Sequence, residues 1–217
     1  MRTVCLPGSL NELWDCLAAH PRHLLYAGGT DLMPQLRSGK IDPPGLIGLE
    51  RIAELKGVGE TASTVRLGAC TTHADLLDHP LILTRFPVLS RALQTLGSPL
   101  IRHMGTLGGN LCTASPAGDT LPPLYVLKAE VELRTREARR TLPVSEFITG
   151  PRRTQLQPGE IVAAVLLDKG PFYDIHHFEK VGLRKSMACS VVSMAAVLKT
   201  SPDGVVEAAR FAWGSIG

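Results

Sequence analysis

Residues 102–119 read RHMGTLGGNLCTASPAGD and crowd glycines, hydroxyl side chains and one acid just ahead of an apolar run. Three of these glycines, Gly105, Gly108 and Gly109, leave backbone N–H groups uncovered by side chains, as a loop that cradles phosphate requires. We therefore interpret this stretch as one half of a phosphate site.

A second glycine pair lies much earlier, in residues 27–34, AGGTDLMP. Here too a Gly pair, a Thr and an acid precede a helical pattern, and residues 23–27 read as a strand. Strand, glycine loop and helix in this order aim backbone N–H groups and a helix dipole at phosphate. A lone Gly pair more often marks an ordinary turn, but two such loops suggest a diphosphate held between them. Because neither loop is G-x-G-x-x-G and no βαβ repeat follows, a Rossmann domain is not expected.

The composition predicts a soluble globular protein. With 217 residues, 44% of them hydrophobic, the chain can bury the core of one large domain or two small ones. The net charge is only +3 and no aromatic residues interleave with the arginines, so no nucleic-acid surface is expected. We see no signal peptide and no apolar run near the roughly 20 residues of a membrane span, which predicts a cytoplasmic location. Five scattered cysteines predict free thiols and no metal site.

Local patterns predict an α+β arrangement. Ser9 and Glu12 form an S-x-x-E capping box, so residues 10–19 should be a helix. Further helices are expected over residues 32–36, from Thr72 onwards, at 88–96, behind Asp119 or Thr120, and at 144–148. Strands are expected at 46–49, 64–69, 131–135, 160–167, 172–180 and 205–213, and residues 150–158 read as a basic loop. Pro171 is predicted to open a further domain, of which only the first strands are present.

Four motifs, in this order and spacing, give the chain a family resemblance: AGGTDLMP, TLGGNLCTASPAGDTLPPL, PGEIV and FEKVGLRKSMACSVVS. They resemble the FAD-binding (medium) subunit of the molybdenum hydroxylases, the family of xanthine dehydrogenase and aerobic carbon monoxide dehydrogenase. The resemblance implies a two-part α+β FAD-binding domain of the vanillyl-alcohol-oxidase (PCMH) type over residues 1–170, with parts at about 1–60 and 61–170. Residues 171–217 would then begin a small α+β carboxy-terminal domain.

By the same resemblance, one set of residues would hold FAD noncovalently. The first loop would wrap the pyrophosphate from one side, the second stretch would approach it from the other, and Lys180 would lie near the ring system. The implied contacts are Ala27, Gly28, Gly29, Thr30, Asp31, Leu32, Thr106, Gly109, Asn110, Thr113, Asp119, Ile161, Val162 and Lys180. No metal is assigned, because the cysteine-rich iron–sulfur insertion of some relatives is absent.

Several of these residues have plainer explanations. Asp119 could simply cap a helix, and a strand lysine such as Lys180 more often faces solvent. His103 stands where a general base can be imagined, although a structural loop histidine is the commoner role. Cys112 could be a reactive thiol or a small buried hydrophobe.

The resemblance implies an electron-transfer flavoprotein with no acid–base triad of its own. A molybdopterin-binding large subunit would oxidise the substrate, a small subunit with [2Fe-2S] clusters would pass the electrons on, and FAD would deliver them to NAD or another acceptor. Two rivals stay open: a self-contained flavin oxidoreductase, which would need catalytic side chains over the ring, and a flavin-less assembly protein of the same fold.

Overall fold

The computed structural model describes residues 2–170, 172–184 and 187–216. Its helices are α1 (Leu10–Ala19), α2 (Leu32–Arg37), α3 (His73–Leu77), α4 (Pro80–Arg85), α5 (Pro87–Thr95), α6 (Pro99–Met104), α7 (Leu107–Thr113), α8 (Leu121–Val126) and α9 (Val144–Phe147), with a 3-10 turn η1 (Ala53–Leu55). Its strands are β1 (Thr3–Cys5), β2 (Leu24–Tyr26), β3 (Gly45–Gly48), β4 (Val58–Glu60), β5 (Thr64–Gly68), β6 (Glu130–Arg134), β7 (Arg139–Pro143), β8 (Ile148–Gly150), β9 (Arg153–Thr154), β10 (Ile161–Asp168), β11 (Ile175–Gly182), β12 (Ser190–Thr200) and β13 (Val206–Gly214). The predicted α+β class is confirmed.

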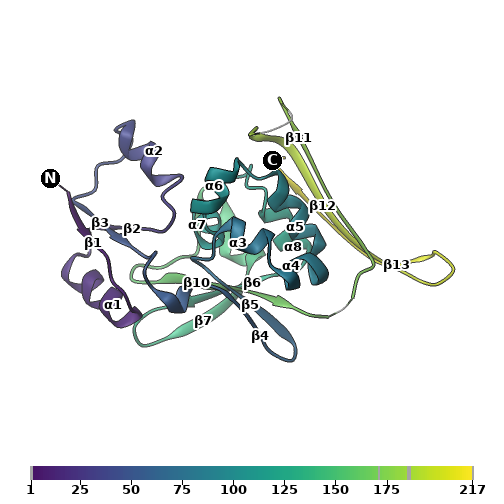
Figure 1. Ribbon diagram of the computed structural model, residues 1–217, viewed down its shortest axis with the longest axis horizontal. Coiled ribbons are helices and arrows are strands. Elements are labelled where there is room, and N and C mark those ends of the chain that lie inside the picture. The colour runs from purple at the N-terminus through teal and green to yellow at the C-terminus, as the bar shows by residue number, and fades with distance from the viewer. Residues whose placement is uncertain (1, 171, 185–186, 217) are drawn as a thin grey trace.

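The amino-terminal part is a three-stranded parallel sheet in the order β1-β3-β2, with α1 beside it (Figure 1). Leu13 and Trp14 of α1 and Ile47 of β3 share one apolar cluster, which explains the helical spacing of the apolar residues. Ser9 caps α1 as predicted, because its hydroxyl accepts from the N–H of Glu12. The return bond of the predicted capping box is displaced by one residue: the Glu12 carboxylate accepts from the N–H of Gly8 at 2.7 Å.

The middle of the molecule is a five-stranded antiparallel sheet, β4-β5-β10-β6-β7, with helices α3 to α8 over one face (Figure 1). Its central strand, β10, is buried on both faces. Ile161 and Ala163 pack toward the amino-terminal cluster, whereas Val162 and Val165 pack under the helices. A bulge between Val162 and Ala164 shifts the alternation of side chains between the two faces of the strand. It therefore allows Val162 and Val165, three positions apart, to lie in the same cluster.

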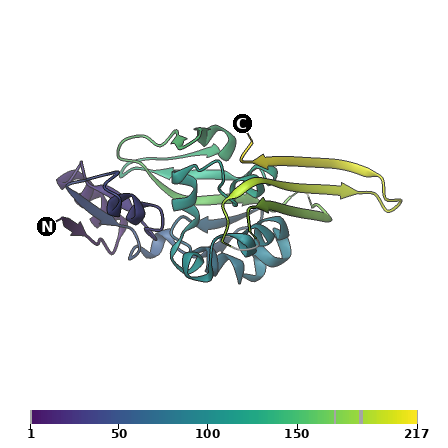
Figure 2. The same cartoon turned by 90° about the horizontal axis from the view of Figure 1, so that it is seen from above.

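Helices α5 and α8 lie between the central sheet and a third, antiparallel sheet, β11-β12-β13 (Figures 1 and 2). In α5, Leu89 and Leu93 join the central core, while Val88 and Ala92 pack against Phe178 and its neighbours on the third sheet. The third sheet is therefore attached through the opposite face of the helices that cover the central one.

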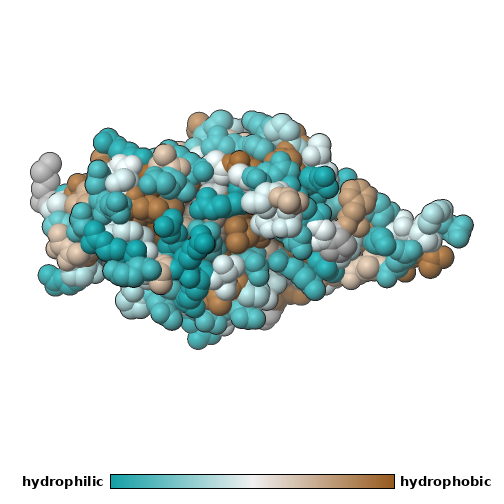
Figure 3. All heavy atoms as spheres, turned by 90° about the horizontal axis from the view of Figure 1, so that it is seen from below, coloured by the Kyte–Doolittle hydropathy of each residue, from teal (hydrophilic) through white to brown (hydrophobic). Residues whose placement is uncertain are grey.

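The face seen from below carries mostly hydrophilic side chains, with apolar ones in small separate groups (Figure 3). Phe211 and Trp213 of β13 are more than half exposed. No helix in the described part of the chain is long and apolar enough to cross a membrane.

Most of the expected elements are confirmed within one to three residues at their ends, but two regions differ. Residues 150–158, expected as a basic loop, contain part of the small β8-β9 sheet. The glycine-rich stretch 102–119, read as a loop, is largely helical, because it ends α6 and contains all of α7. Glycines usually weaken helices, yet Gly108 is required here: a Cβ on it would lie 2.6 Å from the Cβ of Ala69, so only glycine lets α7 pack so closely.

The predicted domain boundaries at about residues 60 and 170 remain a prediction. Pro171, which was expected to open the last unit, lies outside the described residues, as do Lys185 and Ser186 of the fourth motif.

Candidate functional site

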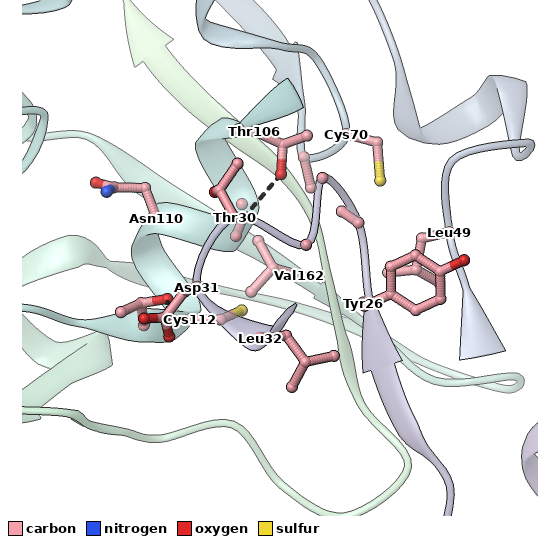
Figure 4. A pocket seen from close by; sticks show the side chains of 18 of the residues that line it. Tyr26, Thr30, Asp31, Leu32, Leu49, Cys70, Thr106, Asn110, Cys112 and Val162 are labelled. Carbon is pink, nitrogen blue, oxygen red and sulfur yellow. Dashed lines mark hydrogen bonds between the residues drawn. The ribbon is translucent and has the colours of Figure 1, made fainter. Parts of the chain in front are cut away.

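A pocket of about 500 Å³ lies where the β2–α2 loop meets α7 and β10. Figure 4 shows side chains of the loop and of α7 gathered around it, with Val162 between them and Tyr26 and Leu49 to one side. Most of the residues expected from the sequence to bind a cofactor line this pocket: Ala27, Gly28, Gly29, Thr30, Asp31, Leu32, Thr106, Gly109, Asn110, Thr113, Ile161 and Val162. The fold therefore brings the two glycine segments to one place.

The two segments touch backbone to backbone at Gly28. A Cβ on this residue would lie 1.6 Å from the carbonyl oxygen of Met104 and 2.4 Å from its carbonyl carbon. No side chain fits there without a shift of the main chain. Gly28 is thus needed for the contact between the loop and the end of α6, in addition to any role in binding a ligand.

The glycines of the second stretch do not offer free amides. Gly105 donates to the carbonyl of Ile101 at 2.7 Å, Gly108 to that of Ala69 at 2.9 Å, and Gly109 to the hydroxyl of Thr106 at 3.2 Å. The prediction that these three N–H groups are available to an anion is therefore wrong. They are used instead to form α7 and to hold it against the central sheet.

The first loop has the amides that the second lacks. Within the described part of the chain, no acceptor pairs with the N–H groups of Gly28, Gly29, Thr30 or Asp31. Gly29 has φ +68°, a left-handed conformation that turns successive N–H groups toward one side of a loop. An anionic group in the pocket would find its backbone donors here.

Asp31 ties this loop to other segments. Its carboxylate accepts from the Gln35 amide at 2.8 Å and from the Thr113 hydroxyl of α7 at 3.3 Å, and it lies 4.0 Å from the Arg152 guanidinium. The arginine pair is about half exposed, so it contributes at most about 1 kcal/mol. Asp31 therefore connects the loop to α7 across the pocket.

Part of the pocket lining is apolar. It includes Leu49, Ile161 and Val162, and Cys70 lies beside them. Burial raises the pKa of the Cys70 thiol to about 12, so it stays protonated and unreactive near neutral pH. Cys112 also lines the pocket. Although the residue is exposed overall, desolvation of its thiol raises the pKa to about 12, which does not support a reactive thiol.

His73 is among the lining residues that were not predicted from the sequence. His73 is only 3% exposed, and burial, helped by the Arg102 guanidinium, lowers its pKa to about 4. The pattern around it, Thr72 with Asp75, correctly predicted the start of α3, where the structure has both bonds of a capping box. It gave no sign that the imidazole would border a cavity. His103, the histidine considered from the sequence, is exposed and does not line the pocket.

Asp119 and Lys180 lie outside the pocket lining and contact each other instead. Lys180 Nζ donates to Asp119 Oδ2 at 2.5 Å and to the carbonyl of Thr95 at 3.3 Å. The Lys180 side chain is 9% exposed and that of Asp119 6%, so the plainer alternative of a solvent-facing lysine is wrong. Burial raises the pKa of Asp119, an effect that Lys180 partly offsets.

The alternative of a capping role for Asp119 is not supported, because its carboxylate accepts from Lys180 and the N-cap of α8 is the next residue. Residue 120 is the N-cap of α8, but it makes no capping bond with its side chain. The Thr120 hydroxyl donates instead to Asn110 Oδ1 at 2.5 Å, which links α8 to α7 behind the pocket. Among the described residues, no three His, Cys, Asp or Glu side chains come together to hold a metal ion.

Comparison with known sequences gives a consistent result. Residues 1–168 match the family described as FAD binding domain in molybdopterin dehydrogenase. The nicotinate dehydrogenase FAD-subunit of Eubacterium barkeri is 33% identical over 196 residues, which are 89% of this chain and 66% of that protein. A putative xanthine dehydrogenase FAD-binding subunit of Escherichia coli K12 is 30% identical over 210 residues, 95% of this chain and 71% of the relative. The chain thus spans about two thirds of the length of these relatives.

Solved structures agree. A carbon monoxide dehydrogenase from Hydrogenophaga pseudoflava superposes with a TM-score of 0.92 at 28% identity, over 98% of this chain and 74% of the other. Quinoline 2-oxidoreductase from Pseudomonas putida 86 gives the same TM-score at 27% identity, over 99% of this chain and 74% of the other. The described fold is therefore shared nearly throughout with chains of these two enzymes.

Proposed function

Because the chain belongs to the family of FAD-binding domains of molybdopterin dehydrogenases, we propose that it relays electrons through FAD between the iron–sulfur clusters of a partner subunit and NAD or another acceptor. The family and the similarity to dehydrogenase FAD subunits identify it as the flavoprotein part of such an oxidoreductase. What we propose beyond the family is the electron relay, the identity of the acceptor and the set of residues that hold FAD.

The observation that carries the assignment of the site is the set of unpaired N–H groups at Gly28, Gly29, Thr30 and Asp31 in the pocket. FAD combines a diphosphate with a large flat ring, so it needs fixed donors at one place and apolar walls at another. The loop supplies the donors without an arginine clamp, and Leu49, Ile161 and Val162 line the apolar side. The pocket of about 500 Å³ is within the usual range for cofactor sites.

Each part of the chain then has a defined task. Bound FAD would supply the redox chemistry, because it accepts and releases electrons singly or in pairs. The loop amides would bind and orient the diphosphate, and α7 with Asp31 would hold the loop in place. The apolar residues would exclude water from the cofactor. Among the described residues that line the pocket, we assign none as a general acid or base, since Cys70 and His73 hold their protonation states near pH 7.

We keep Asp119 and Lys180 as proposed contacts of the cofactor. Asp119 Oδ2 is engaged by Lys180, whereas Oδ1 has no partner among the described residues. A buried acceptor without a partner is a group that a ligand donor can satisfy. Lys180 would hold the carboxylate ionised and directed.

The partners follow from the same proposal. A molybdopterin-binding large subunit would oxidise the substrate, and a small subunit with two [2Fe-2S] clusters would deliver the electrons. The five cysteines of this chain are free and scattered, which does not suit a four-thiolate cluster within it. Substrate and acceptor would be those of the whole complex.

The test is rapid mixing with and without the partner chains expressed from neighbouring genes. The flavin absorbance of the complex should fall when the physiological substrate is added and recover with the acceptor, whereas this chain alone should not respond to that substrate. If the isolated chain oxidises an organic substrate with oxygen, a self-contained flavin oxidoreductase is the correct description. If the complex oxidises its substrate without flavin in this chain, the chain is better described as a flavin-less assembly protein.

A further inference from the structure

His73 is a buried histidine with no assigned role. It is 3% exposed, it lines the pocket, and its Nδ1 has no hydrogen-bond partner among the described residues. Buried polar atoms of this kind are rare in proteins, because an unmade hydrogen bond costs free energy. Because Nδ1 is closed off from solvent, the ring nitrogen that can serve a ligand is Nε2, which lies with Cδ2 on the side of the ring that faces Gly105.

The backbone around His73 is fixed. Its N–H donates to the carbonyl of Gly105 at 3.0 Å, and Thr72 and Asp75 make both bonds of a capping box around it. Thr72 also forms an isolated β-bridge with Thr106, the residue that caps α7. The main chain of His73 is therefore held on the same frame as α7, and burial confines the imidazole.

The imidazole also lies near the donor loop. A Cβ on Gly105 would be 3.1 Å from Cδ2 and 3.4 Å from Nε2 of His73, and a Cβ on Gly28 would be 3.0 Å from the N atom of Gly105. Gly105 thus separates the imidazole from the loop whose N–H groups are unpaired. Whatever anionic group those amides bind has the histidine as a neighbour.

The charge state of His73 suits a donor rather than a counter-ion. Burial and the nearby Arg102 lower its pKa to about 4, so the ring is neutral near pH 7. A neutral imidazole with its proton on Nε2, on the Gly105 side of the ring, can donate to a phosphate oxygen while the buried Nδ1 stays bare.

We propose that His73 is a binding residue for the cofactor and donates a hydrogen bond to a diphosphate oxygen beside the Gly28 loop. This rests on the proposed binding of FAD in the pocket. The histidine thereby supplements the four backbone donors with one side-chain donor, from a segment that the family resemblance left unassigned.

The test compares His73→Leu and His73→Gln with His103→Leu, a matched control at an exposed histidine outside the pocket. For each protein we would measure the dissociation constant of FAD, competition by ADP as a probe of the diphosphate, and the melting midpoint without cofactor. In His73→Leu both nucleotides should bind about 10- to 100-fold more weakly, the effect of one charge-assisted hydrogen bond. His73→Gln, which retains an N–H donor, should recover part of the loss, and His103→Leu should equal the wild type.

The readouts separate the alternatives. Unfolding of the cofactor-free protein should not begin earlier in His73→Leu, because that change removes a buried polar group, whereas a purely structural histidine would lower the midpoint. Unchanged FAD binding in both His73 variants would overturn the proposal. Weaker FAD binding with unaltered ADP competition, or no competition by ADP in the wild type, would overturn the diphosphate assignment. A wild-type protein that takes up no FAD would instead refute the proposed site as a whole.

Discussion

Replacement of Gly28 by alanine tests the contact on which the pocket depends. The new Cβ would lie 1.6 Å from the Met104 carbonyl oxygen, and contacts below 3.0 Å are essentially never seen for real Cβ atoms. The loop or the end of α6 must therefore move by well over an ångström. A shift of that size is large compared with the tolerance of a hydrogen bond, so the loop amides would no longer converge on the diphosphate.

The magnitude follows from the bonds that are lost. A hydrogen bond to a charged group contributes about 1.5–3 kcal/mol. Loss of two of the four proposed amide bonds would thus cost about 3 kcal/mol or more, which corresponds to FAD binding weakened by roughly 100-fold or more. The overpacked backbone would also lower the free energy of unfolding by about 1–3 kcal/mol.

Gly59→Ala is the matched control, because a Cβ on Gly59 would meet nothing within 4 Å. Gly109→Ala is an intermediate case at a residue of the pocket lining, where a Cβ would meet only the Thr106 hydroxyl, at 2.9 Å. The Thr106 side chain can turn away at the cost of a helix cap, about 1 kcal/mol of stability, so Gly109→Ala should weaken FAD binding less than Gly28→Ala does. Dissociation constants from quenching of flavin fluorescence, measured with melting midpoints, would check this order. If Gly28→Ala retains wild-type affinity, the loop contact does not shape the site.

Two further substitutions test buried charges. Lys180→Met leaves the Asp119 carboxylate buried without its partner, so the free energy of unfolding should fall by about 3 kcal/mol in urea titrations, and Asp119→Asn in the same chain should restore much of it. For His73, the folded-state pKa of about 4 lies below the ordinary 6.5, so protonation favours the unfolded chain. Stability from this residue is complete above about pH 6.5 and should decline by up to about 3 kcal/mol toward pH 4. His73→Gln should remove that part of the pH dependence of the free energy of unfolding. If the free energy falls as steeply below pH 6.5 in the variant as in the wild type, this prediction is wrong.

Local signals in the sequence predicted the elements that depend on near neighbours. Ser9 and the apolar spacing behind it located α1, and Thr72 with Asp75 located α3, because caps and helix faces are read within one or two turns. The similarity of the two glycine segments suggested a shared ligand, and the family resemblance supported it, although no local contact connects residues so far apart in the chain.

The contacts that local patterns could not reveal are long-range ones. The helical state of residues 107–113 depends on Gly108 packing on Ala69, a contact made by the tertiary fold and opposed by glycine's own preference. Lys180 and Asp119 are 61 positions apart and meet only because the third sheet packs against α5 and α8. His73 is one of seven histidines, and only the fold distinguishes it as the one with a buried, unpartnered nitrogen at the pocket.

The central claim is that this chain holds FAD noncovalently in the pocket between its glycine loop and α7. Its most direct test is the flavin content of the purified protein, measured from the visible absorption bands and then from the flavin that acid releases into solution. The account predicts a yellow protein, or a colourless one that becomes yellow when FAD is added, with one FAD per chain recovered in the supernatant. A protein that takes up no FAD, or whose flavin stays with the precipitated chain, would contradict it.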